Sequence, residues 1–288
     1  MIAYHVNAFT LEGTGGNPAG VVLDANQLTS KEMQKVAHKL GFSETAFIKD
    51  TRNDDDYQAD FQIRFFTPNT EVDFCGHATL ASFALMHKHS IVSEGCYVQQ
   101  TKAGLLTVEV NENGSITQQQ TLPQFLEKIP HAEVAQSLGL PADCLTSDKY
   151  PIQCVTTGLV DIIIPVEKGV LDSINPNDQA IIDVCRRYNA IGYHLFELDS
   201  AGTIFSANCR NFAPLVDIPE ESATGSASGA LAAYLHKYNS KHPISFRFEQ
   251  GRAMDALSEI FVSLSEVDDV IDGVYVSGYG ELIQTIQL

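Results

Sequence analysis

The stretch Cys75-Gly-His-Ala-Thr-Leu-Ala-Ser-Phe-Ala-Leu-Met-His-Lys88 recurs in altered form as Thr224-Gly-Ser-Ala-Ser-Gly-Ala-Leu-Ala-Ala-Tyr-Leu-His-Lys237. The two stretches align at one offset of 149 residues and share six identical positions, among them the Gly at the second position and the closing His-Lys. A matched piece precedes each of them, Arg64-Phe-Phe-Thr-Pro68 and Arg210-Asn-Phe-Ala-Pro214. A period near half of the chain indicates two similar domains rather than a solenoid of short repeats.

Both stretches have the length of a helix and are apolar on nearly all sides. A helix without a polar stripe must be surrounded by protein. Many short strands, separated by turn sequences such as Asn111-Glu-Asn-Gly114 and Asp272-Gly273, are available to surround it. The sequence therefore predicts an α+β protein of two pseudo-symmetric domains, each a curled β-barrel around one central α-helix.

The predicted boundary between the domains lies near Pro123 and Pro130, which bracket a linker. We expect an N-terminal domain over residues 1–122 and a C-terminal domain over residues 123–274. The last strand, residues 275–288, is expected to cross back to the N-terminal domain.

Local patterns predict further elements in the N-terminal half. Residues 29–40 read as an amphipathic helix that Thr29 and Ser30 open, with Glu32 in its first turn, and that Gly41 ends. Residues 22–24 and 61–66 read as strands, the second with alternating polarity.

Charge and cysteine usage narrow the class of protein. The 288 residues include 36 acids and 18 bases, a net charge of −18. This balance disfavours nucleic acid and anionic membranes as partners. The six cysteines show no disulfide or metal-ligand spacing, and we find neither a leader-like start nor a run of 18 apolar residues. We therefore expect a cytoplasmic protein without a metal.

The starts of the two apolar helices are candidate anion sites. Gly76 and Gly225 place no side chain there, and each is followed by a residue with a donor, His77 or Ser226. Helix starts carry unpaired N–H groups and a positive dipole end, which bind anions. If the two starts face one another across the domain cleft, a small carboxylate fits between them. The alternative is that these residues only cap buried helices.

Glu44 is the candidate acid/base residue. In a strand over residues 41–48, Glu44 would share a face with Phe42, Ala46 and Ile48. Desolvation on an apolar face is expected to raise the pKa of the carboxyl group, which suits proton transfer to and from carbon near neutral pH. Alternatively, Glu44 lies on an edge strand or pairs with Arg64 or Arg210.

Three further residues near the helix starts have ionisable side chains. Glu220 and Glu221 precede the second helix, where acids ordinarily complement the helix dipole. Cys75 precedes the first helix, and a helix start lowers the pKa of a thiol. Its counterpart, Thr224, does not ionise usefully.

An ordered set of motifs resembles the phenazine-biosynthesis isomerase (PhzF-like) family along essentially the whole chain. The motifs are Gly16-Asn-Pro-Ala-Gly-Val-Val22, Ser43-Glu-Thr-Ala-Phe47, Phe66-Thr-Pro68, Cys75-Gly-His-Ala-Thr79, Glu220-Glu-Ser-Ala-Thr-Gly-Ser-Ala227 and Gln250-Gly251. The resemblance implies a diaminopimelate epimerase-like fold, catalysis without a cofactor at the interdomain cleft, and a homodimer.

The resemblance also implies roles for single residues. Glu44 matches the family's acid/base glutamate, His77 and Ser226 match residues that hold or polarise the substrate, and Glu221 stands where the family usually has Asp. We therefore expect Glu44, His77, Glu221 and Ser226 to be catalytic. We assign substrate binding to the residues around them: Asn17, Cys75, Gly76, Thr224 and Gly225.

The sequence departs from the family at two further places, of which the second bears on the substrate class. Ser222 replaces a Pro, and Met254-Asp-Ala-Leu-Ser258 replaces a run that often holds a basic residue. The leading hypothesis is an isomerase that moves a proton between carbons of a small carboxylic acid. The alternatives are an amino-acid racemase or epimerase that uses Cys75, and a non-catalytic carboxylate-binding protein of the same fold.

Overall fold

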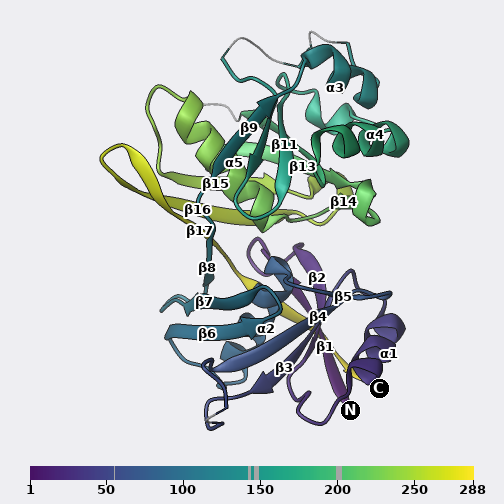
Figure 1. The fold of residues 1–288 in the computed structure, drawn as a ribbon, viewed down its shortest axis with the longest axis vertical. Coiled ribbons are helices and arrows are strands. Elements are labelled where there is room, and N and C mark those ends of the chain that lie inside the picture. The colour runs from purple at the N-terminus through teal and green to yellow at the C-terminus, as the bar shows by residue number, and fades with distance from the viewer. Residues whose placement is uncertain (55, 142–143, 146–148, 199–202) are drawn as a thin grey trace. The chain divides into compact units, whose positions relative to one another are not determined.

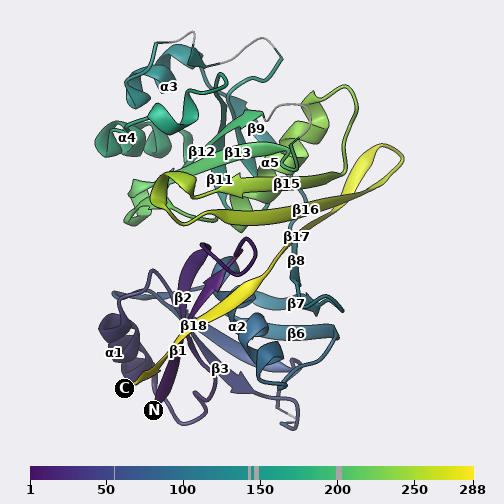
Figure 2. The same ribbon diagram turned by 180° about the vertical axis from the view of Figure 1, so that it is seen from behind.

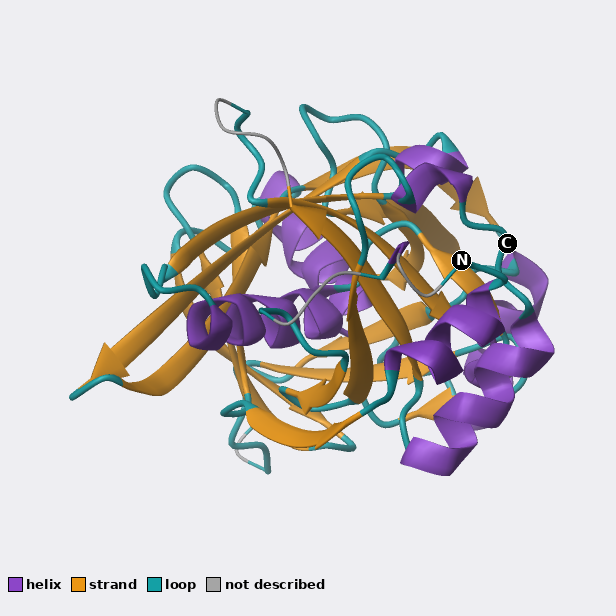
Figure 3. Cartoon of the chain, turned by 90° about the horizontal axis from the view of Figure 1, so that it is seen from above, coloured by secondary structure: helices purple, strands orange, loops and turns teal. Residues whose placement is uncertain are grey.

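The computed structural model describes residues 1–54, 56–141, 144–145, 149–198 and 203–288. Over these residues the protein is a mixed α/β structure with a large β-sheet and five α-helices, and strands make up most of its regular structure (Figure 3). The chain divides into two compact units, unit 1 (residues 1–119 and 277–288) and unit 2 (residues 120–276). No helix in the described residues is long and apolar enough to cross a membrane.

Unit 1 contains a long helix, α2, with strands on several sides of it (Figures 1 and 2). Its elements, including β8, which runs one residue into unit 2, are β1 (Ile2–Ala8), β2 (Asn17–Val22), α1 (Ser30–Leu40), β3 (Thr45–Asp50), β4 (Phe61–Phe66), β5 (Glu71–Val72), α2 (Gly76–Lys88), β6 (Gly95–Thr101), β7 (Gly104–Val110), β8 (Ile116–Gln120) and β18 (Gly280–Gln287).

Unit 2 contains the other long apolar helix, α5, and two helices on the opposite face of its sheet. Its elements, including β17, which runs into unit 1, are β9 (Gln124–Lys128), α3 (His131–Leu138), β10 (Gln153–Thr156), β11 (Val160–Pro165), η2 (Leu171–Ser173), α4 (Asp178–Tyr188), β12 (Gly192–Leu198), β13 (Ala207–Ala213), η3 (Pro214–Val216), β14 (Ile218–Glu221), α5 (Gly225–Tyr238), β15 (Ser245–Gln250), η4 (Arg252–Met254), β16 (Ser258–Val267) and β17 (Val270–Gly278).

The two units repeat one order of strand pairing. In unit 1, β1–β2 is antiparallel, β2–β3 parallel, β3–β4 antiparallel and β4–β6 parallel. In unit 2, β10–β11, β11–β12, β12–β13 and β13–β15 follow with the same directions in the same order. The helices α1 and α4 connect the first parallel pair, and α2 and α5 precede the last strand of the second. This order agrees with the repeat at 149 residues in the sequence.

The first helix forms as its end signals indicate. Thr29 caps α1, and its side chain and that of Glu32 form a capping box. Gly41 ends the helix in the left-handed conformation, with φ of 72°. The predicted helix over residues 29–40 and the predicted strand over residues 61–66 are confirmed.

Two predicted strand boundaries are wrong. Strand β2 ends at Val22 instead of starting there, because the motif around Gly20 is itself strand. A Cβ at Gly20 would lie 2.6 Å from Thr45 Oγ1, so the glycine permits β2 to lie close to β3. Strand β3 begins at Thr45 rather than at residue 41, so Glu44 lies just before the strand and the alternation argument does not apply to it.

Both apolar helices are buried, as their composition predicts. Ten of the 13 residues of α2 are buried, and the helix packs against β1, β2, β3, β7 and β18. Ten of the 14 residues of α5 are buried, and it packs against β10, β11, β15 and β16. That each set of strands is a curled barrel stays a prediction.

The two matched arginines make equivalent ion pairs. Arg64 on β4 donates to both carboxylate oxygens of Glu71 on β5, at 2.7 and 2.9 Å. Arg210 on β13 donates to both oxygens of Glu220 on β14, at 2.8 Å each, and also to the backbone oxygens of Leu171 and Ile174. Each arginine therefore holds the short strand, β5 or β14, that precedes the buried helix of its unit.

These pairs differ in burial, which gives a matched test of stability. The Arg210 side chain is 8% exposed and that of Arg64 is 26% exposed. Replacing Arg210 with Lys removes the bidentate pair and two bonds to carbonyl groups, so the free energy of unfolding should fall by about 2–4 kcal/mol. Arg64→Lys should cost about 1 kcal/mol or less. Urea unfolding measures the free energy of unfolding of both variants. An equal decrease in the two variants would contradict the conclusion that Arg210 stabilises the protein more than Arg64 does.

Candidate active site

The start of α2 brings two of the expected site residues together. Cys75 is the N-cap residue in an extended conformation, and its side chain makes no capping hydrogen bond. Its Sγ lies 3.4 Å from Nδ1 and 3.9 Å from Nε2 of His77, the second residue of the helix. Thiol and imidazole are therefore close enough to exchange a proton.

Glu44 also lies next to this imidazole. Its Oε2 is 3.3 Å from His77 Nε2, and the side chains are 12% and 7% exposed. The distance fits a hydrogen bond but the direction does not, so Oε2 is buried without a hydrogen-bond partner among the described residues. A buried carboxylate oxygen without a bound donor is costly and can accept a proton.

The backbone of unit 1 fixes where Glu44 stands. Gly20 N on β2 donates to Glu44 O at 3.0 Å. Nearby, Gln118 Nε2 donates to Gly76 O at 2.9 Å, and Thr79 Oγ1 donates to Cys75 O. The backbone of Glu44 is thus held by a backbone hydrogen bond, and the backbone of the helix start is held by hydrogen bonds from the side chains of Gln118 and Thr79.

Glu44, Cys75 and His77 together form a mixed set of donor atoms. One ligand atom from each of them falls within 4.8 Å of the others. Carboxylate, thiolate and imidazole are a donor set that suits Zn²⁺. That the protein uses no metal stays a prediction.

The start of α5 has its own polar network in unit 2. Thr224 Oγ1 donates to Glu221 Oε2 at 2.5 Å, and Thr224 N donates to Gln250 Oε1 at 3.1 Å. Gln250 Nε2 donates to Glu221 O at 2.7 Å. Glu221 and Thr224 are therefore held together at this helix start, as Cys75 and His77 are in unit 1.

The remaining predicted residues are placed within their own units. Gly225 and Ser226 begin α5 and are partly exposed. Asn17 is the first residue of β2 and is buried. That the two helix starts face one another stays a prediction.

The structure rejects the alternative that Glu44 pairs with Arg64 or Arg210. Arg64 and Arg210 are committed to Glu71 and Glu220, so neither pairs with Glu44. Glu220 therefore has a structural partner, which separates it from its neighbour Glu221.

A buried polar group in unit 2 was not predicted. Asp161 and His194 are both fully buried in strands, with Asn211 beside them. Asp161 interrupts the apolar run Val160–Pro165 and His194 interrupts the run Gly192–Leu198. These interruptions were the available signal, because an isolated polar residue in a buried strand calls for a specific partner or function.

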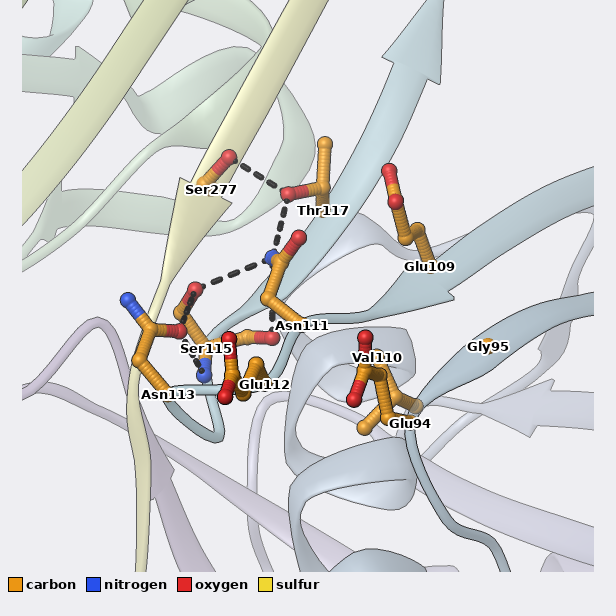
Figure 4. Close-up of a pocket in the computed structure, with 10 residues that line it drawn as sticks. All are labelled: Glu94, Gly95, Glu109, Val110, Asn111, Glu112, Asn113, Ser115, Thr117 and Ser277. Atoms are coloured by element: carbon orange, nitrogen blue, oxygen red, sulfur yellow. Dashed lines mark hydrogen bonds between the residues drawn. The ribbon is translucent and has the colours of Figure 1, made fainter.

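An open pocket of about 830 Å³ lies elsewhere in unit 1, on β6, β7 and β8 (Figure 4). The sticks in Figure 4 show Asn111, Asn113, Ser115 and Thr117 bonded to one another or to Ser277, with Glu94, Glu109 and Glu112 around them. Glu44, Cys75 and His77 are not part of its lining. The pocket is therefore separate from the candidate active site.

Comparison with known proteins gives the family of the chain. The family model described as phenazine biosynthesis-like protein (PhzC-PhzF) matches residues 6–285. The uncharacterized isomerase YfhB of Bacillus subtilis is 32% identical over 90% of this chain and 89% of its own. The uncharacterized isomerase YddE of Escherichia coli O157:H7 is 34% identical over 96% of this chain and 94% of its own.

Solved structures extend the comparison to the fold. A PhzF-family phenazine biosynthesis protein of Bacillus anthracis has a TM-score of 0.91 at 29% identity, covering 100% of this chain and 98% of its own. A hydroxyproline epimerase of Agrobacterium vitis has a TM-score of 0.63 at 12% identity, covering 100% and 90%, which shows a shared fold alone. The chain belongs to the PhzC-PhzF family of phenazine biosynthesis-like proteins and is an isomerase.

Proposed function

We propose that the protein moves a proton between two carbons of a small carboxylic acid, with Glu44 as the general acid/base. The observation that carries this proposal is the buried Glu44 Oε2, which has no hydrogen bond to any residue that the structure describes and lies 3.3 Å from His77 Nε2. A group that takes a proton from carbon and returns it needs such an open acceptor position in a water-poor site.

The proposed reaction needs no reactant besides the substrate and the enzyme. The Glu44 carboxylate removes a proton from one carbon, and the electron pair of that C–H bond moves into the conjugated carboxylate system. The carboxylic acid formed on Glu44 then delivers the proton to a second carbon, and the double bond shifts. No electron leaves the substrate, so the step needs neither an oxidant nor a reductant.

The start of α2 supports this step by binding negative charge. Its first N–H groups and the positive end of its dipole favour the substrate carboxylate and the charge that develops on it. The imidazole of His77, close to both Glu44 and Cys75, donates a hydrogen bond to the same charge. Gly76 leaves the backbone accessible because it has no side chain.

The start of α5 offers the same chemistry in unit 2. Thr224, Gly225 and the Ser226 hydroxyl supply donors there, and Glu221 supplies a second acid bonded to Thr224. We assign these residues, with Asn17, to substrate binding and to acid/base support. The curled barrel around each central helix, catalysis without a cofactor and a homodimer complete the proposal.

A second candidate function is favoured by one contact. Cys75 Sγ lies 3.4 Å from His77 Nδ1, so the thiol can act as an acid/base group toward an α-carbon. The matched residue in unit 2 is Thr224, which disfavours a symmetric two-thiol mechanism. The candidate is therefore an amino-acid racemase or epimerase in which Cys75 works with Glu44.

Glu44→Gln tests the leading proposal. The amide keeps the size of the side chain and cannot accept the proton, so kcat for exchange of substrate hydrogen with deuterated water should fall about 10²–10⁴-fold. NMR of a panel of small unsaturated and cyclic carboxylic acids measures the exchange. Glu94→Gln, an exposed acid of unit 1, is the matched control and should exchange as the wild type does. Exchange that persists in Glu44→Gln would remove Glu44 from the mechanism.

Cys75→Ala separates the two candidate functions. Under the leading proposal the thiol only lines the site, so exchange should fall less than about tenfold. Under the racemase alternative it should fall as steeply as in Glu44→Gln, and a bound acid should protect Cys75 from alkylation. Mass spectrometry of the alkylated protein, with Cys96 as the exposed reference thiol, reads out the protection.

Metal removal tests the predicted absence of a metal. Dialysis against a strong chelator should leave the exchange rate within about twofold of the untreated protein, because every proposed step uses side chains and backbone N–H groups alone. Loss of exchange on dialysis with recovery on adding Zn²⁺ would assign Glu44, Cys75 and His77 as metal ligands instead.

A further inference from the structure

Four polar residues of unit 2 lie on one face of its sheet. Asp161 and Ile163 are two residues apart on β11, and Ile163 is opposite His194 on β12. His194 is opposite Asn211 on β13, and Asn211 is opposite Glu221 on β14. Paired residues of adjacent strands point to the same side of a sheet, as do residues two apart in one strand. Asp161, His194, Asn211 and Glu221 therefore share a face.

This face is the one that α5 covers. Residues of the opposite face, such as Ile162, Tyr193 and Phe212, pack in one core cluster with residues of α3 and α4. Phe196, two residues from His194, has its ring 5.8 Å from that of Tyr234 on α5. The polar face thus lies inside unit 2, on the side of its buried helix.

Asp161 lacks the partners that an ionised carboxylate needs. It is fully buried, and neither carboxyl oxygen has a hydrogen-bond partner among the described residues. An ionised carboxylate in such a position is far more costly than a neutral carboxylic acid. Burial and then the negative charge of Glu221 raise the pKa of Asp161 to about 8, and the Asn211 side chain acts in the opposite direction.

The other titratable neighbours are neutral near pH 7. Burial lowers the pKa of His194 to about 3. Burial also raises the pKa of Cys154 on β10 and of Cys185 on α4 to about 12 each. From α5, Tyr234 donates its hydroxyl proton to Pro151 O. This leaves Glu221 as the charged neighbour that acts on Asp161.

His194 is held in a single protonation pattern by its neighbour. Asn211 Nδ2 lies 3.2 Å from His194 Nδ1, and because an amide nitrogen only donates, Nδ1 accepts. The ring proton is therefore on Nε2, which is buried without a partner among the described residues. His194 and Asn211 are neutral, so they do not offset the charge of Glu221.

Glu221 connects this face to the start of α5. Its Oε2 accepts the short hydrogen bond from Thr224 Oγ1, and Gln250 donates to both Glu221 O and Thr224 Oγ1. The side chain is partly exposed, whereas Asp161 is not. Glu221 is therefore the acid of this face that a ligand can reach.

We propose that Asp161 and Glu221 form a coupled pair of acids, in which Asp161 keeps a proton and thereby allows Glu221 to stay ionised beside Thr224. Asp161 is a positioning residue that acts through Glu221 and does not touch the substrate. Coupling between two titrating groups is reciprocal, so each acid shifts the other by the same amount. The coupling stands without the reaction, and its effect on turnover rests on the proposed function.

Infrared spectroscopy of the full chain tests the coupling directly. A protonated carboxyl group has a C=O stretching band that ionised carboxylates lack. In the wild type a buried-carboxyl band should be present at pH 6 and disappear with a midpoint near pH 8. In Asp161→Asn that band should be missing. In Glu221→Gln it should disappear at a pH lower by about one unit, because the repelling charge is gone.

Glu167→Gln is the matched control, since Glu167 is an exposed acid of the same unit. It should leave the midpoint where the wild type has it. The proposal is overturned if no buried-carboxyl band is present at pH 6, or if Glu221→Gln and Glu167→Gln give the same midpoint. Glu221→Gln decides the coupling even if Asp161→Asn fails to fold.

The raised pKa of Asp161 predicts the outcome of two further measurements. Because the pKa of Asp161 is higher in the folded than in the unfolded chain, its contribution to stability is present at low pH and is lost as the pH rises from about 4 to 8. The urea midpoint of Asp161→Asn relative to wild type should therefore rise over this range. Ionisation of Asp161 should also lower the wild-type exchange rate about tenfold per pH unit above pH 8, and Asp161→Asn should remove this slope.

The outcomes separate this proposal from the proposed function. Exchange that survives Glu44→Gln rejects the role of Glu44 and leaves the infrared result untouched. An unshifted midpoint in Glu221→Gln rejects the coupled pair and leaves the role of Glu44 untouched.

Discussion

The burial of two helices that lack a polar face is the constraint on which this structure depends. An apolar helix has no side that can be left to water, so strands must cover it on several sides. Strands placed in this way keep most of α2 and α5 from solvent while leaving Gly76 and Gly225 at the helix starts partly exposed. The first turn of such a helix presents unpaired backbone N–H groups, and the candidate catalytic groups of unit 1 gather there.

Much of the fold could be predicted because its signals are local. The capping box of Thr29 and Glu32, the left-handed Gly41 and the apolar helices each depend on a few consecutive residues. The strand boundaries around Gly20 and Glu44 could not be predicted in this way. They depend on how closely β2 approaches β3, which is a contact between segments that local polarity does not describe.

The candidate site was predictable to a similar extent. The Cys75-Gly-His77 start and Glu44 stood out as chemistry at an apolar helix and in a motif, and the structure brings them within hydrogen-bond distance of one imidazole. Asp161 and His194 did not stand out, because each lies in a strand that is otherwise mostly apolar and belongs to no motif. Their significance arises from strand register, which places them on one face with Glu221.

The pairing of β1 with β18 has a consequence for how the chain is made. Unit 1 needs residues 277–288 as well as residues 1–119, and Ile2 pairs with Gln287 across that gap. Unit 2 is one continuous segment. During synthesis, therefore, all residues of unit 2 are made before unit 1 is complete. Until β18 is made, residues 1–119 lack the strand that pairs with β1. Closing so long a loop is slow, and it exposes an unpaired edge of β1 to association with other chains in the meantime.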